Sequence, residues 1–191
     1  MKKELILTLS AAAMAAAPSA FAQTASAPAA ATAYAVATVQ KACLPMLRGE
    51  AVKSAAQSAG FRLENGGWVM PIAGKDEIDL DPPDSVNPHV CTVTITAQPS
   101  DAAAMRSALG AWAAAQRPPL SADGVDQSAP GAQGWVTSTW TGRAAGGAES
   151  VVLTQPQSPA QSPAQATPAA ATDQPAAGRV QSTLLVSLSP S

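Results

Sequence analysis

The chain is poor in the side chains that most often carry chemistry. Its 191 residues include one histidine and two cysteines, and aromatic residues make up 4%. It contains no GxSxG nucleophile elbow, no glycine-rich phosphate loop leading into a helix, no HExxH and no CxxC. These absences exclude the enzyme classes that such motifs define. The sequence therefore predicts no catalytic centre, no cofactor and no metal site, and it favours a protein that is not an enzyme.

Basic charge is also scarce, because the formal net charge is −2 and charged residues make up 13% of the chain. Nucleic acids and anionic membrane surfaces both select a basic patch. We therefore expect no nucleic-acid partner. Hydrophobic residues reach 47%, but many of them are alanine, which buries little area. We therefore expect a single domain with a modest hydrophobic core.

Residues 1–22 have the pattern of a secretory leader. Lys2 and Lys3 precede an apolar run over 5–17, and a small-x-small pattern ends at Ala22. We expect export by a bacterial cell, cleavage after Ala22, and a periplasmic or secreted protein. No later stretch approaches the roughly 20 apolar residues that span a membrane, so we expect no membrane insertion after cleavage.

Composition divides the rest of the chain into four parts. We expect a flexible spacer over 23–32, a single domain over 33–155, a Pro/Ala/Gln-rich low-complexity insert over 156–179, and a returning strand of the same domain over 180–189. The insert carries a proline every few residues and no apolar side chain larger than alanine. It cannot bury enough surface to fold by itself.

Hydrophobic periodicity predicts two helical regions. The first covers 33–59, with a break over 44–49 because Pro45 removes a helix hydrogen bond, and a second helical piece over 50–59. The second begins at Ser100 or Asp101 and ends before Pro118-Pro119.

Alternating or β-branched runs predict six strands, at 67–73, 76–81, 90–98, 135–141, 150–155 and 180–189. Residues 121–134 are polar and predict a loop. The last strand is expected to pair with 150–155. The result is an α+β fold of order αβββαβββ, a two-layer sandwich with an antiparallel sheet of about six strands and helices on one face. Gly67-Trp68-Val69 and Gly134-Trp135-Val136 hint at an internal duplication.

Cys43 and Cys91 are predicted to form a structural disulfide, because both lie in the exported part. The alternative is a reactive or metal-binding thiol pair. Without a CxxC and with His89 as the only histidine, redox or zinc chemistry has little to build on.

Three further groups of residues were weighed for function. Five acids within 76–84, namely Asp76, Glu77, Asp79, Asp81 and Asp84, offer oxygen ligands but lack the spacing of a calcium loop, so we interpret them as the solvated face and edge of a strand. Ser85, His89 and Asp84 could form a hydrolase triad. Trp68, Trp112, Trp135 and Trp140 could line a carbohydrate or peptide groove, and Trp140 is expected to be the exposed one.

The chain resembles small exported bacterial proteins of uncharacterised function. The likeness rests on the leader, a Cys in the first helix, a Cys opening a TVTIT strand, an Ala-Trp-Ala helix and a VVLTQ strand. This resemblance implies no activity and no site. The sequence thus predicts a binding or inhibitor-like envelope protein whose partner is another envelope or secreted protein. The alternative is a periplasmic hydrolase using Ser85, His89 and Asp84. The oligomeric state stays open.

Overall fold

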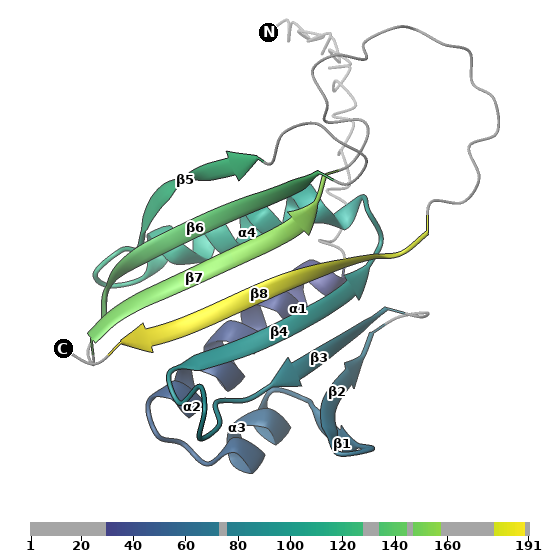
Figure 1. The fold of residues 1–191 in the computed structure, drawn as a ribbon, viewed down its shortest axis with the longest axis vertical. Helices are drawn as coiled ribbons and strands as arrows, with labels where there is room; N and C mark the ends of the chain where they lie inside the picture. Colours follow the sequence, from purple (N-terminus) through teal and green to yellow (C-terminus); the bar gives the residue numbers. More distant parts are fainter. Residues whose placement is uncertain (1–29, 73–75, 128–133, 145–146, 158–177, 190–191) are drawn as a thin grey trace, which may run out of the picture.

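The computed structural model describes residues 30–72, 76–127, 134–144, 147–157 and 178–189 (Figure 1). The helical elements are α1 (Ala30–Thr38), η1 (Val39–Cys43), α2 (Leu44–Leu47), α3 (Val52–Ser58) and α4 (Asp101–Ala115). The strands are β1 (Arg62–Glu64), β2 (Gly67–Pro71), β3 (Glu77–Asp81), β4 (Val90–Ala97), β5 (Ser121–Gln127), β6 (Trp135–Ala144), β7 (Gly147–Pro156) and β8 (Val180–Ser189). The predicted leader, and positions 158–177 of the predicted insert, lie outside the described residues.

The strands form one antiparallel sheet in the order β1-β2-β3-β4-β8-β7-β6-β5. All helices of the described residues lie on the same face of this sheet (Figure 1). The predicted α+β class, the single antiparallel sheet and the one-sided helices are therefore confirmed. The strand count was wrong, because the sheet has eight strands rather than about six. The order was wrong too: each half has four strands, and several short helices precede the first.

The two unpredicted strands, β1 and β5, occupy the two edges of the sheet. β1 has three residues, all exposed, and the polar β5 runs through the segment expected to be a loop. An edge strand that is exposed on both faces needs no alternation of apolar residues. Periodicity therefore gave no signal for either of them.

The sheet consists of two similar halves, each a helical segment followed by a four-stranded meander. The strand order is symmetric about the β4–β8 pair. Trp68 and Trp135 lie at the start of the second strand of each half. The repeated Gly-Trp-Val thus falls at equivalent places, which supports the internal duplication suggested by the sequence.

The first helical region continues from α1 through α2 and breaks only at 48–51, later than the predicted start at Leu44, and the expected second helical piece is present as α3. Pro45 is accommodated in the first turn of α2, directly after the π-helical turn η1. The wider π turn moves away the carbonyl that a proline ring would otherwise meet. The helix ends at Arg48 and Gly49, and Gly49 has a φ of +95°. Its start at Ala30, with Thr32 already buried, shortens the expected spacer.

The core lies between the helices and the sheet. Side chains alternate along β4, so that Cys91, Val93 and Ile95 are fully buried while the threonines between them are half-buried. The predicted disulfide is confirmed: Cys43 of η1 is bonded to Cys91 of β4, with 5.5 Å between the Cα atoms. It links the first helical segment to the buried face of the sheet.

β8 lies in the middle of the sheet, between β4 and β7. It pairs with β7, as expected for the returning strand, and on its other side with β4. The two halves of the molecule are therefore joined through the last strand in the chain. In the part of the chain that the structure describes, no helix is long and apolar enough to cross a membrane.

Candidate functional site

One face of the sheet carries no helix in the described residues (Figure 1), and we call it the open face. Its side chains are those that alternate with the buried ones along each strand. The open face crosses all eight strands.

A row of threonines crosses the middle of the open face. Strand register places Thr94, Thr183, Thr154 and Thr137 side by side on β4, β8, β7 and β6. The row ends in Asp79 on β3 and Asp126 on β5. Thr137 and Thr154 hydroxyls lie 3.4 Å apart, within hydrogen-bonding distance. The row gives the centre of the face closely spaced hydroxyl and methyl groups.

An apolar pair lies next to this row. Leu185 of β8 pairs with Val152 of β7, and its side chain is 38% exposed. No helix of the described residues covers this leucine at the centre of the sheet. It supplies the kind of apolar contact that interfaces gather at their centre.

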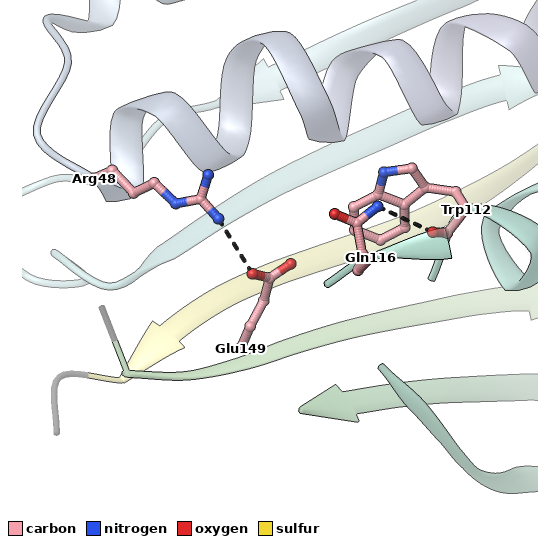
Figure 2. Close-up of polar contacts among 4 residues, drawn as sticks. All are labelled: Arg48, Trp112, Gln116 and Glu149. Atoms are coloured by element: carbon pink, nitrogen blue, oxygen red, sulfur yellow. Dashed lines mark hydrogen bonds and ion pairs between the residues drawn. The ribbon is translucent and has the colours of Figure 1, made fainter. Parts of the chain in front are cut away.

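A second candidate site lies on the helix side, where Arg48 at the end of α2 meets Glu149 near the start of β7 (Figure 2). The Arg48 Nη2 donates to Glu149 Oε2 at 3.4 Å. Glu149 is 3% exposed, whereas Arg48 is 47% exposed. The nearby Gln116 side chain of the α4 C-cap donates to the Trp112 carbonyl at 3.0 Å.

Two polar atoms of this cluster lack partners. Glu149 Oε1 and Trp112 Nε1 are buried without a hydrogen bond among the described residues. Burial raises the pKa of the Glu149 carboxyl above its ordinary 4.5, and the Arg48 charge opposes that rise. The contact between Arg48 and Glu149 joins the helical layer to β7.

Gln155 anchors the other end of β7 in the same way. Its Nε2 donates to the Ala102 carbonyl at 3.0 Å, and its Oε1 accepts from Arg106 Nε at 3.5 Å. β7 is thus fixed to the helical layer by one polar side chain near each end.

Ser85, His89 and Asp84 all lie in the exposed loop between β3 and β4. Asp84 Oδ1 accepts the backbone N–H groups of Val86 and Asn87, at 2.8 and 2.6 Å. This is a local turn in which the carboxylate is already engaged by the backbone. The hydrolase alternative therefore gains no support from the geometry of the loop.

The acidic segment forms no metal cluster. Among the described residues, no three carboxylate, histidine or cysteine side chains converge on a point where an ion could bind. Part of our interpretation was wrong, because β3 is an interior strand between β2 and β4, not a sheet edge. Its acids do occupy one face, as predicted, with Ile78 and Leu80 buried on the other.

The tryptophans do not line a common groove. Trp112 and Trp140 are each 6% exposed, whereas Trp135 is 42% exposed. The expectation that Trp140 is the exposed one was wrong. Trp140 shares the helix-facing side of β6 with Val136 and packs against α4, where a Cβ added at Gly110 would lie in ordinary contact, 3.6 Å from its indole nitrogen.

No protein-family model matches the chain, and neither a search of curated proteins nor one of solved structures finds a match.

For two features of these sites, the sequence pattern indicates which face of the sheet the residues occupy. Glu149 lies two residues before Val151 in the same strand phase, so alternation already placed it on the buried face. The alternation of Thr137, Thr139 and Thr141 likewise marked the open side of β6. The partner of Glu149 had no such signal, because Arg48 is 101 residues away.

Proposed function

We propose that the protein is an exported, non-catalytic binding protein of the bacterial envelope, which engages another protein through the open face. The observation that carries this proposal is an eight-stranded face that no helix of the described residues covers, with the exposed Leu185 near its centre. Soluble proteins rarely leave apolar groups together on a broad surface unless that surface binds something.

Three features support export and a binding role. The disulfide between Cys43 and Cys91 is typical of an oxidising compartment. The sheet is held to its helices by this bond and by the anchors at Glu149 and Gln155. A face that is fixed in this way presents its side chains with little loss of entropy on binding, which favours affinity.

The test compares two tyrosine substitutions in the protein lacking residues 1–22. Thr183→Tyr places a bulky neutral side chain in the middle of the open face, whereas Ser107→Tyr places it on the exposed side of α4. Each protein is immobilised and exposed to envelope extract, and the captured material is quantified after cross-linking. We expect a stoichiometric partner on the wild type and on Ser107→Tyr, and its loss from Thr183→Tyr.

Two outcomes would overturn the proposal. Loss of the partner from Ser107→Tyr, with retention by Thr183→Tyr, would move the binding surface to the helices. A hydrolytic activity found in a substrate screen, and abolished by His89→Ala, would replace binding with catalysis.

A further inference from the structure

We propose that the partner of the open face is a basic protein, bound through complementary charge around the apolar centre; this inference rests on the proposed function. The open face and the helix side differ in charge. In the described residues the open face carries six acids against two bases. The acids are Glu64, Glu77, Asp79, Asp81, Asp123 and Asp126, and the bases are Arg62 and Arg143.

The basic charges on the open face offset little of this. Arg62 is paired with Glu64 on the same short strand, at 3.4 Å, which leaves five acids and Arg143 on this face. Arg143 lies on β6, four strands away from β3, which corresponds to about 19 Å at the usual strand spacing. That separation exceeds the screening length of about 8 Å at physiological salt.

The strongest charge lies on β3, where Glu77, Asp79 and Asp81 follow one another on the open face. Successive side chains on one face of a strand are about 7 Å apart, so these carboxylates repel one another within the screening length. The register gives none of them a basic neighbour: Glu77 and Asp79 lie opposite Pro71 and Val69 on β2 and opposite threonines on β4. Arg179, just before β8, is a base near the start of β3, but it is paired with Asp76 at 2.7 Å. The three β3 acids are therefore like charges that no ion pair of the described residues compensates.

The helix side has the opposite balance. Arg48 at the end of α2 is paired with Glu149. The other charges of the helices and of the segment before α3 are three bases, Lys41, Lys53 and Arg106, against two acids, Glu50 and Asp101. Positive charge is thus directed away from the open face. A basic partner would be attracted to one side of the molecule and repelled from the other.

The layout fits a protein surface better than a metal ion. The acids line strands instead of converging, and the described residues contain no cluster that could hold an ion. Leu185 and Val152 lie between the β3 acids and Asp126. An apolar centre with a charged surround is the usual anatomy of a protein interface. The partner should therefore carry an apolar side chain surrounded by lysine or arginine.

The test uses defined peptides as probes with the protein lacking residues 1–22. Fluorescence anisotropy measures the affinity for a labelled peptide of alternating lysine and leucine, with an alternating glutamate–leucine peptide as the control of opposite charge. We expect the lysine peptide to bind, the glutamate peptide not to bind, and the affinity to fall steeply as salt is raised.

Two double variants with the same change in net charge localise the site. Glu77→Gln with Asp81→Asn removes two charges from the open face, and Glu50→Gln with Asp101→Asn removes two from the helix side. The first should weaken binding about fivefold or more, since each exposed pair contributes modestly. The second should leave the affinity within about twofold. Circular dichroism establishes that both variants are folded.

Equal losses in both double variants, or binding that is insensitive to salt, would overturn the inference. Failure of this inference about a basic partner can be distinguished from failure of the proposed function. If Thr183→Tyr abolishes capture of the envelope partner while the Glu77→Gln/Asp81→Asn variant retains it, the open face binds a partner, but not through basic charge.

Discussion

Glu149 is the residue at which burial and charge oppose each other most directly. Its carboxyl is 3% exposed, it receives one long hydrogen bond from Arg48, and its second oxygen has no partner among the described residues. A buried carboxylate that is only partly compensated costs free energy in its charged form. The folded protein therefore holds a proton at Glu149 more tightly than the unfolded chain does.

A pH dependence of stability follows from the raised pKa of Glu149. Because the folded state binds the proton more tightly, the contribution of this group to the free energy of unfolding is fully present below pH 4.5 and declines as the pH rises through the folded pKa. Glu149→Gln removes this titration. We expect the advantage of the wild type over Glu149→Gln to be largest near about pH 4 and to shrink toward about pH 7 in urea unfolding curves.

Arg48→Gln provides the complementary variant. The Arg48 charge opposes the rise in the pKa of Glu149, so its removal should raise that pKa further and make the loss of stability with pH larger. If the wild-type advantage over Glu149→Gln instead increased with pH, the ion pair with Arg48 would outweigh burial.

At the scale of elements, one covalent bond joins the first helical segment to the sheet. Cys43 and Cys91 are 48 residues apart in the chain. The helix they anchor is rich in alanine, which contributes little buried area per residue. The disulfide therefore compensates for a helix–sheet interface with few large side chains.

The double variant Cys43→Ala/Cys91→Ala should lower the free energy of unfolding by about 4 kcal/mol, the value expected for closing a loop of this length. Guanidinium unfolding of the variant and of the oxidised protein measures the difference. Thiol titration of denatured, unreduced protein should detect no free thiol. Equal unfolding midpoints would mean that the bond forms but contributes nothing to stability.

The turn between β1 and β2 has a backbone conformation that explains why Asn and Gly occupy it. Asn65 and Gly66 both have positive φ, +50° and +86°, which is the two-residue turn that Asn-Gly favours. Gly66→Ala should cost about 1 kcal/mol for conformational reasons alone, because no atom lies within 4 Å of the added Cβ.

Gly67→Ala is the matched control for that turn. Gly67 has no positive φ, and the atom nearest to an added Cβ is the Glu64 carbonyl oxygen at 3.8 Å. The melting temperature of Gly67→Ala should stay close to that of the wild type, whereas that of Gly66→Ala should fall. Equal effects of the two substitutions would indicate that the turn frays before the domain unfolds.

At the scale of the whole molecule, the last strand joins the two halves of the sheet. β8 lies between β4 and β7, and Leu184, Val186 and Leu188 are among its buried side chains. The low-complexity insert thus separates β7 from the strand that completes the fold. Closure entropy grows slowly with loop length, so the fold tolerates a long connection at this point.

Replacing residues 158–177 with a few glycines and serines should change the free energy of unfolding by about 1 kcal/mol or less, in the stabilising direction. Gln157 is retained because its N–H donates to the Gly134 carbonyl at 2.6 Å. Thermal melts of both proteins measure the effect. A large loss of stability would mean that the insert contributes contacts of its own.

Truncation after Gln155 should have the opposite result. It removes the strand between β4 and β7 and leaves both with unpaired edges next to a bared apolar face, so we expect aggregation. Size-exclusion chromatography and a thermal melt would decide this. A truncated protein that stays monomeric and melts like the full chain would contradict the central position of β8.

Local patterns predicted most of the interior of the fold. Alternation along β3 and β4 assigned the correct face to each side chain, because a strand has only two faces and water favours one set of residues on each. The same reasoning missed β1 and β5, whose exposed positions carry no such preference. It also assigned Trp140 to the exposed face of β6, because the packing of α4 decides which face of that strand is buried.

The sequence by itself predicted a secretory leader, which lies outside the described residues, and it determined the class of fold, the pairing of the two cysteines and the return of the last strand. Each depends on local composition or on a pattern with few alternatives. Only the tertiary structure decided that β8 lies at the centre of the sheet, that Arg48 meets Glu149, and that the acids of β3 share a helix-free face with Leu185. Those contacts join residues distant in the chain, and their partners are selected by the packing of the whole sheet against its helices rather than by any local preference.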